Sequence, residues 1–199
     1  MIPVKPKPEP ANFQKTVRQK GLAWIQKSGL DPELPVPSGT KIPSHWTNCL
    51  DDLWSAYDEV CAYVCLHIPK ITGAKSVEHF APKSKRLDQA YEWSNYRLVC
   101  ARLNSRKRDF EDVLDPFTLK KDTFLVDFVT GRIVLSSALS AAKRTAAKDT
   151  IDRLKLDEPD LRKQRVADLD KALGGDWSVK ELKKVSPFVW YEAKRQKLI

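Results

Sequence analysis

Long apolar runs and a disulfide framework are both missing from this sequence. No apolar run approaches the roughly 20 residues that cross a bilayer, and the first ten residues are too polar and proline-rich for a signal peptide. The chain has only four cysteines, in no pattern typical of a disulfide-bonded scaffold. These absences predict a protein of the reducing cytoplasm that works without a membrane.

The composition is that of a folded, basic protein. Of the 199 residues, 42% are hydrophobic and six are Trp, enough for one good core or a small module with a helical extension. Lys and Arg number 35 against 26 Asp and Glu, which gives a net charge of +9. This excess is a modest attraction toward polyanions such as nucleic acid.

Changes in residue pattern along the chain suggest four segments. Four prolines make the start an extended arm, and Gly29 would end the first helix that follows it. Later, Thr130-Gly131 would turn a β-hairpin, Gly174-Gly175 would end a helix, and Ser178 would cap the next one. The predicted segments are the arm (1–11), N-terminal helices and linker (12–58), a core with its following hairpin (59–136), and a C-terminal helical subdomain (137–199).

The stretch from Val77 to Lys107 carries the candidate chemistry. Glu78 and His79 fall on a short predicted strand, Asn95 opens a second strand, and Asn104 is suited to the N-cap of a short helix. A neutral imidazole can take a proton from water, so His79 is the candidate base. Hard cations prefer oxygen ligands, so Glu78 and Asn104 are candidate ligands for Mg²⁺ or Mn²⁺.

Two further roles follow from the same stretch. The Asn95 side chain has both donors and an acceptor, which suits it to bracing the loop between the strands and orienting His79. Lys83, Arg106 and Lys107 flank the candidate site and are predicted to contact phosphates of a nucleic-acid backbone. Because strand neighbours point to opposite faces, Glu78 and His79 can share one ion only if the strand bends or ends there.

This order of residues resembles the HNH, or ββα-metal, nuclease family, and more closely the Septu-type, PtuB-like proteins of bacterial anti-phage defence. Further matching features are Tyr91 and Trp93 before Asn95, and Asp115-Pro116-Phe117 after the helix. The resemblance implies an α+β fold with an HNH core, flanking helices, an extra β-hairpin and a C-terminal helical extension. It also implies an endonuclease acting under an SMC- or ABC-like (PtuA-like) ATPase, in some systems beside a retron reverse transcriptase and its RNA–DNA product.

The chain departs from that family at its zinc knuckles. The family pattern has two Cys-x-x-Cys pairs, whereas here Cys61 and Cys65 are one residue too far apart and Leu103 stands where the partner of Cys100 should be. A structural Zn²⁺ would need a fourth ligand such as His67. The spacing favours a degenerate ribbon, in which these cysteines pack as small apolar side chains.

Two functions therefore remain open from the sequence. The first is a metal-dependent endonuclease that hydrolyses phosphodiester bonds with little base selectivity. The second is a catalytically reduced module that keeps the HNH shape and binds nucleic acid or protein. The damaged ribbon favours the second, and the retained Glu78, His79, Asn95 and Asn104 favour the first.

Overall fold

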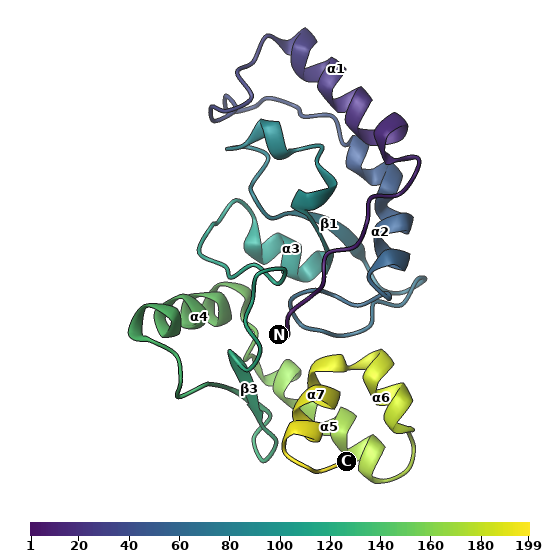
Figure 1. Ribbon diagram of the computed structural model, residues 1–199, viewed down its shortest axis with the longest axis vertical. Coiled ribbons are helices and arrows are strands. Elements are labelled where there is room, and N and C mark those ends of the chain that lie inside the picture. Colours follow the sequence, from purple (N-terminus) through teal and green to yellow (C-terminus); the bar gives the residue numbers. More distant parts are fainter. The chain divides into compact units, whose positions relative to one another are not determined.

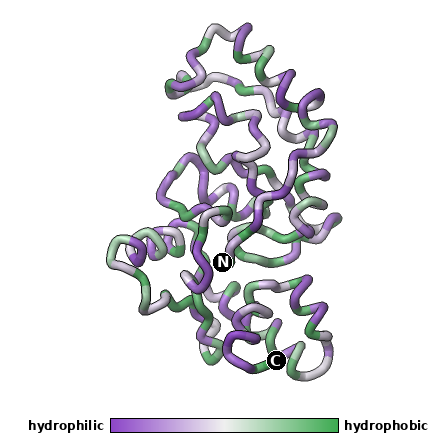
Figure 2. Tube along the Cα trace, viewed as in Figure 1, coloured by the Kyte–Doolittle hydropathy of each residue, from purple (hydrophilic) through white to green (hydrophobic).

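The computed structural model describes all 199 residues (Figure 1) and confirms the predicted α+β class, with seven α-helices and two separate two-stranded antiparallel sheets. The chain forms two compact units, each built from stretches that are separate in the sequence. The N-terminal unit contains residues 6–59 and 69–111, and the C-terminal unit contains residues 1–5, 60–68 and 112–199. Hydrophobic and hydrophilic residues are interspersed along the whole trace (Figure 2). No helix has the length and apolar character needed to cross a membrane.

The N-terminal unit is built on two strands and the helix that follows them. Strand β1 (Lys75–His79) pairs antiparallel with β2 (Tyr96–Cys100), so that His79 lies opposite Tyr96. The insert between them contains two short 3-10 turns, Leu87–Gln89 and Trp93–Asn95. The predicted order of strand, insert, strand and helix is confirmed.

The boundaries of the following helix differ from the prediction. Helix α3 runs from Ala101 to Lys107, because β2 passes into it without a loop and Cys100 is its N-cap. Asn104 therefore lies in the helix interior, and its predicted N-cap position is wrong. The helix ends at Lys107, because Arg108 adopts a positive φ of 49°.

Helices from the first part of the chain support this core. A π-helical turn (Gln14–Arg18) leads into α1 (Gln19–Ser28), which ends at Gly29 in the left-handed conformation expected of a C-terminal glycine. A 3-10 turn (His45–Cys49) leads into α2 (Leu50–Ala56). Both predicted helices are thus present, each with an irregular first turn.

Gly21 explains how α1 approaches the insert. The sequence pattern predicts a helix that this glycine weakens, whereas the structure uses it for packing. A Cβ at position 21 would overlap the Tyr91 ring, which is 1% exposed and donates a hydrogen bond to the Pro43 carbonyl at 2.8 Å. The missing side chain lets the ring lie directly against the helix.

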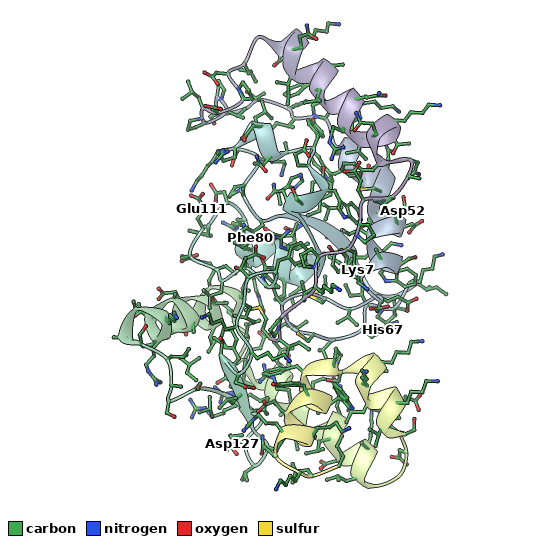
Figure 3. All side chains as sticks on the ribbon, viewed as in Figure 1. Lys7, Asp52, His67, Phe80, Glu111 and Asp127 are labelled. Atoms are coloured by element: carbon green, nitrogen blue, oxygen red, sulfur yellow. The ribbon has the colours of Figure 1, made fainter.

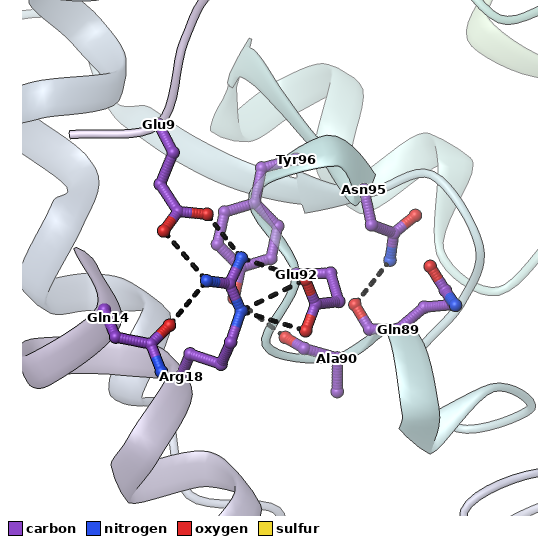
Figure 4. A network of polar contacts seen from close by, with 8 residues as sticks. All are labelled: Glu9, Gln14, Arg18, Gln89, Ala90, Glu92, Asn95 and Tyr96. Carbon is purple, nitrogen blue, oxygen red and sulfur yellow. Dashed lines mark hydrogen bonds and ion pairs between the residues drawn. The ribbon is translucent and has the colours of Figure 1, made fainter. Parts of the chain in front are cut away.

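The extended arm is held within the same unit from Pro6 onward. The Lys7 amide donates to the Tyr57 hydroxyl at 3.1 Å, and the Trp93 indole donates to the Lys7 carbonyl at 2.8 Å. Arg18 joins arm, helix and insert, because its guanidinium bonds Glu9, Gln14 and Glu92 (Figure 4).

The C-terminal unit contains the hairpin and the remaining helices. Strands β3 (Phe124–Asp127) and β4 (Arg132–Leu135) form the predicted hairpin, which is a sheet of its own and belongs to this unit rather than extending the first sheet. Asp127 at its turn is labelled in Figure 3. The helices are α4 (Ala141–Leu154), α5 (Pro159–Leu173), α6 (Val179–Val185) and α7 (Pro187–Arg195).

The ends and the core of these helices follow the sequence closely. The Ser178 hydroxyl accepts a hydrogen bond from the Glu181 amide at 3.1 Å, which confirms the predicted cap of α6. Pro187 begins α7, at the helix position where a proline is best tolerated. Buried apolar residues of three helices form the core of the unit, namely Leu169, Leu182, Val189 and Ala193.

Replacement of Gly21 by Ala tests this packing. Alanine is the better helix former by about 1 kcal/mol, but its methyl group overlaps a buried ring that is fixed by its hydroxyl. We expect Gly21→Ala to destabilise the protein by about 1–3 kcal/mol in chemical denaturation. Lys20→Ala, at an exposed position of the same helix, is the control and should change stability by less than about 0.5 kcal/mol. A more stable Gly21→Ala variant would contradict the packing.

Candidate active site

A cleft of about 370 Å³ opens in the N-terminal unit, where β1, the insert and the end of α3 meet. It brings together side chains that are far apart in the sequence and mostly polar. The residues that line it are Trp46, Ser76, Val77, His79, Pro82, Lys83, Ser84, Asn104, Arg108 and Asp109. Three of the predicted site residues, His79, Lys83 and Asn104, therefore share one cavity.

His79 is held as a neutral imidazole at this cleft. Its Nε2 lies 3.0 Å from the Ala90 carbonyl oxygen, and a carbonyl can only accept, so Nε2 carries the proton and Nδ1 the lone pair. The ring is 7% exposed. Burial first, and then the charge of Lys83, lowers the pKa of His79 from 6.5 to about 3.

Aromatic residues fix the orientation of that ring. Trp46 and Tyr96 meet it edge to face, with centroids 4.7 and 5.1 Å away. The Tyr96 hydroxyl also donates to the Ala90 carbonyl, at 2.8 Å, so one oxygen anchors both side chains. No motif in the sequence marks either aromatic residue as part of the site. The pairing of the two strands would have indicated Tyr96, which lies opposite His79.

Asn95 braces the insert, as predicted. Its carboxamide oxygen accepts from the Ala81 amide at 2.7 Å, and its nitrogen donates to the carbonyls of Ala81 and Gln89, both at 3.0 Å. These bonds tie the two ends of the insert together. They fix the backbone just before Ala90, whose carbonyl orients His79.

Asn104 reaches the cleft from the interior of α3. Its amide nitrogen donates to the Ser76 hydroxyl at 2.6 Å and to the Val77 carbonyl at 3.3 Å. The nitrogen is therefore committed to β1. The carbonyl oxygen is the remaining atom of this side chain that can serve as a ligand.

Glu78 does not join His79 and Asn104. Strand β1 stays regular through His79, so the two neighbouring side chains point to opposite faces. Glu78 is 1% exposed and lies 2.8 Å from the ammonium of Lys107. It is not among the residues that line the cleft. The prediction that Glu78 and Asn104 bind one metal ion together is therefore not met by this structure.

The prediction that Lys107 contacts phosphate is wrong. Its side chain is fully buried, and besides Glu78 its ammonium donates to the carbonyls of Phe80 at 2.7 Å and His79 at 3.3 Å. Phe80, labelled in Figure 3, directly follows β1. Lys107 therefore fastens α3 to the end of β1, which is a structural role.

The cations at the cleft are Lys83 and Arg108. The Lys83 ammonium lies 5.2 Å from the centroid of the Trp46 ring, and burial lowers its pKa. Arg108 is exposed, directly follows the last residue of α3 and lines the cleft. Arg106, the third predicted phosphate contact, does not line the cleft.

The cysteines of the candidate zinc ribbon belong to different compact units. Cys61 and Cys65 lie in a buried turn of the C-terminal unit, where the Cys65 amide donates to the Cys61 carbonyl at 2.9 Å. Cys100 caps α3 in the N-terminal unit. None of the three is in a disulfide. His67, the suggested fourth ligand, donates its amide to the Val185 carbonyl at 2.9 Å.

The donors at the cleft suit a hard cation only in part. Asn104, Ser76 and Asp109 offer oxygen atoms, the type of ligand that Mg²⁺ takes while keeping several waters. No three His, Cys, Asp or Glu side chains gather in a metal-binding arrangement. The cleft fits an ion held by Asn104 and few other protein ligands, and it does not fit the predicted use of Glu78.

A double-mutant cycle tests the ion pair that removes Glu78 from the cleft. Lys107→Met leaves a buried carboxylate without its partner, so we expect a loss of about 3–5 kcal/mol in the free energy of unfolding. The double variant Glu78→Gln/Lys107→Met should recover a large part of that loss. Lys27→Met, the same change at an exposed position of α1, is the control. If the loss of stability in the double variant equals the sum of the losses in Lys107→Met and Glu78→Gln, the pair does not form.

No protein-family model matches the chain, and no curated protein matches it.

Proposed function

We propose that this chain is a metal-dependent endonuclease of the HNH type, which hydrolyses phosphodiester bonds in nucleic acid. The observation that carries the proposal is the neutral imidazole of His79, bonded through Nε2 to a backbone carbonyl in a cleft that also holds Asn104 and two cationic side chains. The strand–insert–strand–helix order around this cleft supports the HNH assignment.

His79 acts as the general base. Its Nδ1 takes a proton from the attacking water, while Nε2 keeps its own proton and donates it in a hydrogen bond to the Ala90 carbonyl, which stabilises the imidazolium that forms. The charge of Lys83 contributes to the low pKa of His79. A phosphate bound beside Lys83 offsets that charge, and the pKa of His79 then rises toward the range in which a base removes a proton from water efficiently.

The remaining residues bind and orient the substrate. Lys83 and Arg108 neutralise the scissile phosphate and its neighbour, and Asn95 keeps the insert in the shape that presents His79. Asn104 supplies the main oxygen ligand for Mg²⁺ or Mn²⁺. When bound, such an ion polarises the phosphate and stabilises the leaving oxygen.

The setting proposed for this activity is bacterial anti-phage defence. It rests on the resemblance of the Glu78–Lys107 stretch to the Septu-type HNH proteins. In that setting the chain works in the cytoplasm as the effector of an SMC- or ABC-like ATPase, which restrains or targets the nuclease. A retron reverse transcriptase with its RNA–DNA product is a further candidate partner. Copurification of such an ATPase with the tagged chain tests this setting, and its repeated absence would count against it.

A second candidate function is a binding module without catalysis. The observation that favours it is the ion pair between Glu78 and Lys107, which neutralises a carboxylate that a metal-dependent nuclease would use. Under this alternative the cleft still binds a nucleic-acid backbone through Lys83 and Arg108. The two functions differ in whether bound nucleic acid is cut.

Replacement of His79 separates the two functions. We expect the parent protein to cleave plasmid DNA or RNA with Mg²⁺ or Mn²⁺, to stop in EDTA, and to lose at least about 100-fold in rate with His79→Ala. Nucleic-acid binding should stay within about twofold. His45→Ala removes an imidazole that does not line the cleft and is the matched control. Equal rates for His79→Ala and the parent would refute the assignment of the base, and no cleavage by either would favour the binding module.

The phosphate contacts have their own test. Lys83→Gln and Arg108→Gln should each weaken binding evenly across sequences and reduce the slope of log affinity against log salt by about 1. Lys15→Gln, an exposed cation outside the cleft, should leave the slope unchanged. Fluorescence anisotropy with a labelled oligonucleotide measures all three. Equal slopes for parent and variants would remove both residues from the interface.

A further inference from the structure

A second and larger cavity lies in the C-terminal unit. It is a groove of about 730 Å³ between the segment before β3 and the N-terminal half of α4 (both elements are labelled in Figure 1). Apolar side chains make up much of its wall, and they come from both sides. They are Leu114, Leu119, Leu139, Ala142 and Ala146.

The protein's own core leaves this wall uncovered. The buried residues of α4 are Ala147, Thr150 and Leu154, so no residue before the middle of the helix is buried. The preceding residues, from Ala141 to Thr145, are all exposed. Three half-buried leucines face the same groove. An apolar hollow of this size is typical of a binding site rather than of ordinary surface.

Cations outnumber anions in the lining of the groove, with three lysines against two aspartates. Lys120, Lys121 and Lys143 are exposed in its lining, and none of them forms an ion pair. The two carboxylates in the lining already accept hydrogen bonds: Asp115 from the Phe117 amide at 3.0 Å, and Asp122 from the Tyr191 hydroxyl at 2.7 Å. An apolar floor beside three unpaired ammonium groups is complementary to an acidic, apolar ligand.

We propose that this groove binds an acidic amphipathic helix of a protein partner, with leucine-sized side chains on one face and Glu or Asp beside them. Nucleic acid would satisfy the lysines but offers no apolar stripe for the leucines and alanines. A second copy of this chain is disfavoured, because each copy carries a net charge of +9. The groove lies in the unit that lacks His79, so this inference does not rest on the proposed endonuclease.

The test uses the full chain and a fluorescein-labelled synthetic helix of about 18 residues, roughly 27 Å long, with leucines on one face and Glu elsewhere. We expect micromolar binding in fluorescence anisotropy. Ala142→Glu should weaken it at least about tenfold by placing a charge in the groove. The double variant Lys121→Glu/Lys143→Glu should weaken it similarly and remove most of its salt dependence. Lys148→Glu, exposed on α4 outside the groove, is the matched control and should bind within about twofold of the parent.

Two comparison probes decide between occupants. A peptide of the same composition with scrambled leucines should bind at least about tenfold more weakly than the amphipathic one, and a single-stranded oligonucleotide should be insensitive to Ala142→Glu. Circular dichroism melting of each variant confirms that it is folded. Three outcomes would overturn the proposal: no binding of the amphipathic peptide, equal binding by the parent and Ala142→Glu, or an oligonucleotide that binds in competition with the peptide and loses affinity with Ala142→Glu.

Discussion

The ion pair between Glu78 and Lys107 is the constraint on which the candidate site depends. Both groups are at least 99% buried, and a buried charge without its partner is strongly destabilising, so α3 must stay fastened to β1. The same ammonium holds the carbonyls of His79 and Phe80. It thus fixes the strand end from which the imidazole projects and keeps Asn104, one turn earlier on the helix, beside Ser76.

A second set of contacts determines the shape of the cleft from the opposite direction. Gly21 lets Tyr91 lie on α1, Tyr91 packs against Trp46, and Trp46 meets the edge of His79. Asn95 and Tyr96 fix the same ring through the backbone around Ala90. The imidazole is therefore positioned by packing and hydrogen bonds before any ligand arrives, which is the condition for efficient proton transfer.

Local pattern predicted the elements well, because each had a local cause: alternation in β3, Gly29 after α1, and the Ser178 cap of α6. Long-range pairing was harder to predict. The sequence marks Lys107 as one cation of a basic helix end, and only the packing of α3 on β1 reveals that it is buried. For the same reason Arg108, at an exposed helix end, replaces it at the cleft.

The discontinuous make-up of the two compact units has a consequence for biosynthesis. The backbone crosses from one unit to the other four times, at residues 5/6, 59/60, 68/69 and 111/112. The turn at 60–68 emerges from the ribosome well before α6, whose Val185 carbonyl accepts the His67 amide. All residues of the N-terminal unit have been made once Glu111 is added, before the α6 partner of the 60–68 turn, and no single uninterrupted stretch of the gene encodes either unit.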